Sequence, residues 1–269
     1  MQAVLKTYPL ATVALGRSLV GCLLMASHQK EGHTVGLYFR GNGPLGVVFA
    51  EASYDGAARA HTSQPQLELP LKNGLLDVGG AIGIGLLDVV RIGSDSQKPH
   101  SGTVMIKTGE IGDDIAYYLQ QSQQIPSAVV LGVEVDEYGK VKGAGGLLVE
   151  LFPGAPDNVI TGIEANLKSA GSVSKMISGG ASPETLAACF LKGFALEEFK
   201  HESRVRYECR CNIDRVKNAL VLLGPEEIHD MIQSKKGIDA KCDFCGRRYA
   251  VSLDELKALK SQSVRRSFH

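Results

Sequence analysis

The sequence predicts an α+β fold: a core domain with a mainly antiparallel sheet, a helical linker and a small C-terminal zinc-binding redox domain. Strand and turn signals follow one another early in the chain with few helices between them, which favours an antiparallel sheet over alternating βα units. A Pro- and Gly-rich break at 152–156 is followed by helical stretches, and two close cysteine pairs lie near the end. We expect the core at 1–155, the linker at 156–204 and the zinc-binding redox-switch domain at 205–269.

The first apolar segment, 12–27, repeats its apolar residues at helical spacing and predicts a buried helix. The apolar stretch 10–25 is interrupted by Arg17 and is too short for a bilayer, so we expect no membrane span. The rest of the core has one helical pattern, at 112–122. Strand and turn signals lie at 34–40, 47–50, 79–91, 101–107, 128–135 and 145–151.

Gly41, Gly43 and Gly46 match the G-x-G-x-x-G pattern of dinucleotide-binding proteins. That site needs a helix to begin within the glycine run, so that the helix N-terminus receives the pyrophosphate. Pro44 and the β-branched residues after Gly46 favour a hairpin turn instead.

Capping residues mark the ends of the helices that we expect after the core. Ser182 and Pro183 begin the last of three linker helices, expected at 158–170, 173–177 and 183–190. In the C-terminal domain, Asn212 begins a helix that ends at Gly224, and a capping box at 252–255 begins the final helix. About a dozen apolar residues form a thin core there, so we expect folding of this domain to depend on the metal.

The composition excludes several classes of protein. Hydrophobic residues make up 44% of the chain and the formal net charge is zero, which favours a globular protein over a polybasic nucleic-acid or membrane binder. The last 69 residues hold 14 Lys and Arg against 10 Asp and Glu, a weak basic excess. Six cysteines without a visible signal peptide favour the cytoplasm, where thiols stay reduced.

Four of those cysteines form the most informative motif. Cys209-x-Cys211 and Cys242-x-x-Cys245 are separated by thirty residues, and two such pairs suit a tetrahedral zinc ion. The Cys-x-Cys spacing is tighter than in purely structural sites, and its thiols can be oxidised to a disulfide. Nearby Arg and Lys residues favour the thiolate form, which binds zinc and also reacts with oxidants. We therefore expect one zinc per chain when reduced and, from proximity in sequence, the disulfides Cys209–Cys211 and Cys242–Cys245 when oxidised.

Other interpretations compete with this one. The four cysteines suit a plain structural zinc site, and Cys242 and Cys245 a thioredoxin-like oxidoreductase, although that needs the pair at a helix start. His201 or His229 could replace a thiol ligand. Cys22 and Cys189 lie on apolar helical faces and are expected to be buried hydrophobic residues. Four acidic residues are expected to be solvated caps or turn residues: Asp113, Asp114, Asp136 and Glu137.

The C-terminal motifs resemble the redox domain of the heat-shock protein 33 family, the oxidation-activated bacterial chaperones. The matching residues are Cys209, Arg210, Cys211, Asn212, Arg215, Val216, Ala219, Leu220, Leu223, Gly224, Glu226, Glu227, Cys242, Phe244, Cys245 and Tyr249. The resemblance extends into the core at 12–17 and 41–46 and at Pro153-Gly154, so it covers nearly the whole chain. Family members usually carry a few dozen residues, including an opening strand, before the segment that matches Thr12. A chain without that strand is expected to expose a sheet edge.

The resemblance implies an ATP-independent holdase rather than an enzyme. The reduced, zinc-bound protein would be inactive, and oxidation with an unfolding stress would release zinc, unfold the redox domain and destabilise the linker. The active form would be a homodimer that holds unfolded client proteins for ATP-dependent refolding chaperones. The resemblance implies Cys209, Cys211, Cys242 and Cys245 as the zinc ligands, no nucleic-acid or membrane partner, and client binding around the linker.

Two rival functions remain open at this point. A zinc-ribbon nucleic-acid-binding protein would show salt-sensitive binding to DNA or RNA. A dithiol oxidoreductase would turn over disulfides catalytically, whereas a holdase binds its clients stoichiometrically.

Overall fold

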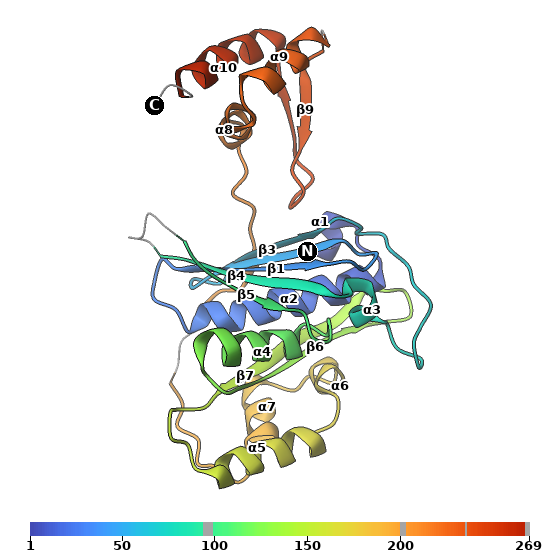
Figure 1. Cartoon of the computed structure of the whole chain (residues 1–269). Helices are drawn as coiled ribbons and strands as arrows, with labels where there is room; N and C mark the ends of the chain where they lie inside the picture. The colour runs from blue at the N-terminus through green and yellow to red at the C-terminus, as the bar shows by residue number, and fades with distance from the viewer. Residues whose placement is uncertain (94–98, 200–202, 235, 267–269) are drawn as a thin grey trace. The chain divides into compact units, whose positions relative to one another are not determined.

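β1 (Thr34–Gly41) lies inside a six-stranded sheet, between β2 (Val47–Ser53) and β4 (Gly85–Ile92). The computed structural model describes residues 1–93, 99–199, 203–234 and 236–266. In the six-stranded sheet the strands follow the order β5-β4-β1-β2-β3-β8 (Figure 1). Its other strands are β3 (Ala57–Thr62), β5 (His100–Met105) and β8 (Arg206–Tyr207). β8 runs parallel to β3 and the remaining pairs are antiparallel, so the predicted α+β fold with a mainly antiparallel sheet is confirmed.

The glycine-rich segment 41–46 joins β1 to β2 as the predicted hairpin turn. Its glycines allow the short helix α3 (Val78–Ile82) to approach closely. A Cβ on Gly41 would lie 1.9 Å from the carbonyl oxygen of Ile82, so no larger residue fits there without a shift of backbone. These glycines therefore serve packing of the core.

α2 (Pro9–Ser27) is the central helix of the core, and it packs between the six-stranded sheet and a second, two-stranded sheet (Figure 1). The second sheet pairs β6 (Ser127–Val135) with β7 (Val141–Glu150). α4 (Gly112–Gln123) contacts β5 and β6 and buries Ile115, Tyr118 and Leu119 in the same core. The short α1 (Gln2–Leu5) precedes α2.

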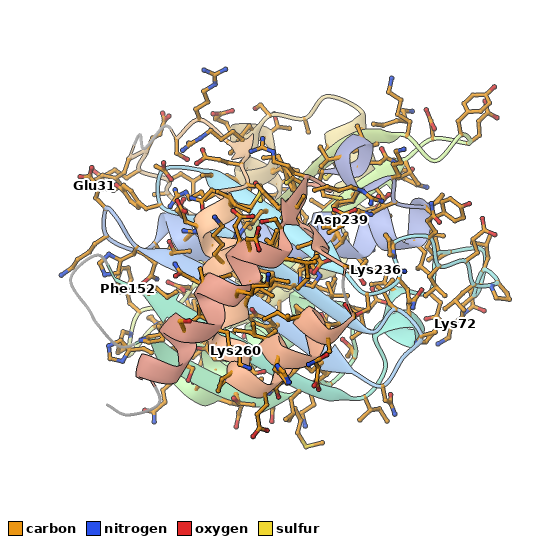
Figure 2. The ribbon with its side chains drawn as sticks, turned by 90° about the horizontal axis from the view of Figure 1, so that it is seen from above. Glu31, Lys72, Phe152, Lys236, Asp239 and Lys260 are labelled. Atoms are coloured by element: carbon orange, nitrogen blue, oxygen red, sulfur yellow. The ribbon has the colours of Figure 1, made fainter. Side chains whose placement is uncertain are left out.

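Three linker helices follow β7: α5 (Asp157–Ser169), α6 (Val173–Ser178) and α7 (Pro183–Phe190). α6 packs against β6 and β7, on the side of that sheet away from α2 (Figure 1). Their small apolar cluster is centred on Val173, Leu186 and Phe190. Phe152, which leads into these helices, is 88% exposed and lies at the periphery of this part of the chain (Figure 2). The described linker helices therefore contact the core chiefly through α6, whose cluster includes Val130 and Leu147 of the second sheet.

The chain divides into two compact units, Met1–Glu208 and Cys209–His269. The second contains α8 (Ile213–Leu223), α9 (Pro225–Gln233) and α10 (Leu253–Arg266), with the hairpin of β9 (Ile238–Lys241) and β10 (Arg248–Val251). Among the described residues its core has six buried apolar side chains: Leu220, Val221, Ile228, Val251, Leu256 and Leu259. This is the thin core that the sequence predicts.

The caps that the sequence predicts are formed. Asn212 Oδ1 accepts a hydrogen bond of 2.8 Å from the amide of Arg215 at the start of α8. The carboxylate of Glu255 accepts from the amide of Ser252, and the Ser252 hydroxyl accepts from the amide of Glu255, which completes the capping box. In the linker, the Ser182 hydroxyl accepts from the amide of Thr185.

Several expectations were wrong. α1, β3, β8 and β9 were not predicted, and Gly79–Ile82 belongs to helix α3 rather than to a strand. Asp114 is not a solvated cap, because it is fully buried and its Oδ1 accepts from the amides of Lys107 and Thr108. α2 is long and apolar enough to cross a membrane by length and composition, contrary to the expectation from length. It is nevertheless the predicted buried helix, since 72% of its apolar window lies inside the first unit.

Candidate metal centre

The four cysteine sulfurs predicted as ligands lie within 4.8 Å of one another in the second unit. Two of the sulfur pairs cross between the motifs: Cys209 to Cys242 at 3.6 Å and Cys211 to Cys245 at 3.3 Å. All four residues are free thiols of intermediate exposure. The structure therefore brings together two motifs thirty residues apart and leaves them within reach of small molecules in solvent.

Cys242 and Cys245 lie in the turn that joins β9 to β10. The amide of Gly246 donates to the carbonyl of Cys242 at 2.8 Å, and the amide of Cys242 donates to the carbonyl of Arg247 at 2.9 Å. Gly246 has a φ of 71°, in the left-handed region that glycine adopts without steric strain. This turn presents both sulfurs on one side of the hairpin.

Cys209 and Cys211 lie in the extended segment before α8, where Asn212 fixes the helix start. Because the cap sets the direction in which the chain enters α8, the position of Cys211 next to it is constrained as well. One cysteine pair thus comes from a helix start and the other from a hairpin turn, so each pair is positioned by its own local structure.

The donor set fits a tetrahedral metal ion. Zinc–sulfur bonds of about 2.3 Å place tetrahedral sulfurs roughly 3.8 Å apart, close to the distances between these thiols. Four thiolates without a carboxylate suit a soft or borderline metal such as zinc rather than magnesium or calcium. The cluster could therefore hold a metal ion without rearrangement of the backbone.

The Cys209 and Cys211 thiols differ in acidity. Burial raises the pKa of Cys209 to about 12, and hydrogen bonds with neighbouring thiols add to the increase. Burial also opposes ionisation of Cys211, but hydrogen bonds from Tyr249 and from the other thiols outweigh it and lower its pKa to about 7. Of these two thiols, Cys211 is the one that its surroundings favour as a thiolate.

The basic residues around the motifs contribute unequally. Arg247 interacts electrostatically with Cys211 and Cys245. Arg248, by contrast, pairs with Asp239, and Arg206 pairs with Asp55 in the first unit. The number of basic residues near a motif in the sequence therefore overstates the positive charge that its thiols experience.

His229, Cys22 and Cys189, the alternative residues that the structure describes, make their contacts outside the four-cysteine cluster. The ring nitrogens of His229 on α9 contact Gln233 and Lys260, and His201 lies outside the described residues. Cys22 is fully buried in α2, as predicted, and burial raises the pKa of its thiol. Cys189 is only partly buried, in the linker cluster.

Two functional features escaped the sequence reasoning. Tyr249 donates a hydrogen bond of 3.0 Å to Cys211 Sγ, although the sequence singles it out only as a residue that matches the family motif. The second feature is an apolar groove of about 970 Å³ in the first unit, between α2, β7 and the segment that contains β8. Leu19 and Leu23 line it on α2, and Val205 and Tyr207 line it beside β8. Alternation of the apolar residues 205 and 207 was the one available signal for this strand.

Known proteins resemble the chain over nearly its whole length. A family model described as Hsp33 protein matches residues 1–252. A protein named 33 kDa chaperonin from Synechococcus sp. (strain JA-3-3Ab) is 43% identical over 94% of this chain and 79% of its own length. Another of that name, from Nostoc punctiforme, is 41% identical over 93% of this chain and 83% of its own length. The crystal structure of a 33 kDa chaperonin from Thermotoga maritima superposes with a TM-score of 0.85 at 35% identity, covering 98% of this chain and 90% of the other.

Proposed function

The chain belongs to the Hsp33 protein family and is a chaperone, and on that premise we propose that it is a redox-regulated, ATP-independent holdase. The reduced form binds one zinc ion through Cys209, Cys211, Cys242 and Cys245 and is inactive. Oxidation of these thiols activates binding of unfolded clients. The proposed working parts are the core at 1–155, the linker at 156–204 and the redox switch at 205–269.

The observation that supports this most directly is the position of four thiols within 4.8 Å of one another on a unit with a very small apolar core. A bound zinc ion supplies cross-links between the two cysteine pairs. Metal-binding free energies of roughly 10–16 kcal/mol, as in small zinc modules, would dominate the stability of such a unit. Oxidation of the four thiolates would release the metal and would therefore also unfold this unit.

In this proposal, each cysteine pair is oxidised in two steps. A thiolate attacks one oxygen of a peroxide, which breaks the O–O bond and yields a sulfenic acid and hydroxide. The neighbouring thiol then attacks the sulfenic sulfur, so that a disulfide forms and water leaves. Two peroxide molecules produce Cys209–Cys211 and Cys242–Cys245, and sulfurs bonded in disulfides no longer hold the metal.

Client binding would follow from exposure of apolar surface in the first unit. β8 ends at Tyr207, two residues before Cys209 in the sequence, and only two of its residues pair with β3. If the redox switch unfolds, the segment that follows β8 in the sequence is no longer folded and no longer helps to hold β8 in place. Its release would open the apolar groove beside α2, and the linker helices with their small cluster would loosen in the same way.

The test follows zinc release and the aggregation of a thermally unfolding client in the same samples, at increasing peroxide and a mildly denaturing temperature. We expect one zinc per chain to leave as two disulfides form, with holding activity appearing at that point. Cys189→Ala serves as the control for zinc release, because this cysteine lies outside the four-cysteine site and its loss should leave the release of zinc by peroxide unchanged. Zinc release without holding activity would remove the proposal and leave a structural zinc site.

The same samples separate the rival functions. Salt-sensitive binding of DNA or RNA by the reduced protein would favour the zinc-ribbon interpretation. Catalytic turnover of a disulfide substrate would favour an oxidoreductase. For the chaperone we propose a cytoplasmic location, a homodimer after oxidation and transfer of clients to ATP-dependent refolding chaperones.

A further inference from the structure

Tyr249 is a strand residue of the second unit whose hydroxyl contacts the sulfur of Cys211. It lies on β10 opposite Ala240 of β9, and Val251 two residues later is buried in the core of the unit. Side chains two residues apart in a strand share a face, so Tyr249 is directed to the core side of the hairpin. There its hydroxyl donates a 3.0 Å hydrogen bond to Cys211 Sγ.

Arg247 places a positive charge close to the same pair, because its guanidinium interacts with both Tyr249 and Cys211. A nearby cation stabilises negative charge on a thiolate, so it acts on Cys211 in the same sense as the Tyr249 hydrogen bond.

We propose that Tyr249 is a positioning residue that holds Cys211 in the metal site and protects its sulfur from oxidants. This inference rests on the proposed function and deepens it, since it names a residue that sets the oxidant threshold of the switch. A hydrogen bond to a thiolate spreads the negative charge of the sulfur and lowers its reactivity towards peroxide. It also fixes the direction from which the sulfur approaches the metal, as partners of metal ligands commonly do.

The matched experiment compares Tyr249→Phe with Tyr207→Phe in the full-length, zinc-loaded chain. Both changes remove one hydroxyl and keep the ring, but the Tyr207 hydroxyl donates to the carbonyl of Ala60 in the first unit. Zinc transfer to a chromophoric chelator is measured without oxidant, and the zinc-saturated melting curves report whether either variant is unfolded. We expect the Tyr249→Phe chain to lose zinc about tenfold more readily, and the Tyr207→Phe chain to retain zinc as the wild type does.

Two further measurements address the sulfur itself. Peroxide should consume the Cys211 thiol several-fold faster in Tyr249→Phe, whereas the rates at Cys242 in the same chain change less. In cobalt(II)-loaded protein, the sulfur-to-metal charge-transfer band should move to longer wavelength, because the sulfur loses a hydrogen bond that lowers its orbital energies. A residue needed only for packing would change neither the band nor the ratio of the two rates.

The outcomes separate this inference from the proposed function. A Tyr249→Phe chain that retains zinc and shows the wild-type cobalt spectrum would overturn the role of Tyr249 and leave the holdase proposal untouched. A wild-type chain that binds zinc but never gains holding activity would remove the holdase proposal, while zinc retention in the variant would still decide the role of Tyr249. A wild-type chain that takes up neither zinc nor cobalt would overturn both.

Discussion

Arg206 and Asp55 form an ion pair that fastens β8 to the turn between β2 and β3. Arg206 Nη2 lies 2.6 Å from Asp55 Oδ2, and Nη1 donates to the backbone carbonyl of the same residue at 2.9 Å. Hydrogen bonds from Arg206 hold the pKa of Asp55 well below its usual range. Arg206 lies three residues before Cys209 in the sequence, so the ion pair holds the edge strand of the core sheet just before the chain reaches the candidate metal centre.

The first prediction concerns this ion pair. Asp55→Asn removes one of the two carboxylates that Arg206 contacts, the other being that of Glu208, and β8 has only one other residue paired with β3. We expect amide hydrogen exchange at Arg206 and Glu208 to accelerate about two- to fivefold, in line with a mostly exposed pair. Holding activity should appear at less peroxide than in the wild type.

Asp88→Asn is the control for that change, because Asp88 pairs with Arg40 on the same sheet at a distance of 2.6 Å. This variant should leave exchange in β8 and the peroxide threshold unchanged. Equal effects of the two substitutions would mean that any loss of surface charge, rather than release of β8, lowers the threshold.

The second prediction concerns the pairing of the disulfides. Trypsin cleaves after Arg206, Arg210, Arg215, Lys241 and Arg247, which separates three cysteine peptides: 207–210, 211–215 and 242–247. After oxidation we expect 207–210 joined to 211–215, and 242–247 two hydrogens lighter with an internal disulfide. Peptide 242–247 joined to either of the others would show pairing across the motifs, along the 3.6 and 3.3 Å contacts of the reduced site, and would contradict the proposed pairs.

The third prediction concerns the core of the redox switch. Leu256 is fully buried there, and Leu256→Ala should destabilise the unit by about 2–5 kcal/mol through lost contacts and a cavity. Because folding and metal binding are linked, zinc should pass to a chelator more readily and activation should need less heat. The matched control is Leu222→Ala on α8, whose side chain is 79% exposed. Equal zinc retention in both variants would show that the core does not support the metal site.

The fourth prediction concerns pH and the pair of His28 and Glu150. The hydrogen bond between them, 3.0 Å long, raises the pKa of His28 and lowers that of Glu150. The raised pKa of His28 adds to the free energy of unfolding. This contribution is complete below the ordinary pKa of 6.5 and is lost as pH rises through the raised pKa. The stabilising contribution of Glu150 is present above its ordinary pKa of 4.5 and is lost as pH falls through its lowered pKa. The pair therefore stabilises the first unit most between these two pH values.

Urea unfolding of His28→Gln against wild type measures this effect. The variant should be less stable by about 0.5 kcal/mol near pH 6, and the difference should shrink near pH 8.5. His33→Gln is the comparison, since a ring nitrogen of His33 contacts the carbonyl of Glu31 rather than a carboxylate. A stability difference that stays the same at both pH values would contradict an electrostatic origin.

Local signals in the sequence determined much of this protein. The hairpin at Gly41–Gly46, the caps at Asn212 and Ser252 and the spacing of the four cysteines each depend on residues a few positions apart, where backbone sterics and hydrogen bonding decide the structure. The same holds for the resemblance to the family, which is carried by short motifs. These features therefore predicted the fold class and the candidate site before any packing was known.

Tertiary structure alone decided which distant residues meet. Nothing near Asp114 in the sequence shows that it is buried, and nothing near Arg206 shows that it pairs with a residue 151 positions earlier. The contact of Tyr249 with Cys211 spans 38 positions and depends on how the β9–β10 hairpin lies against the start of α8. Such contacts arise when separate elements bury their apolar faces together, and burial of a shared core leaves no periodic trace at the polar positions that it brings into contact.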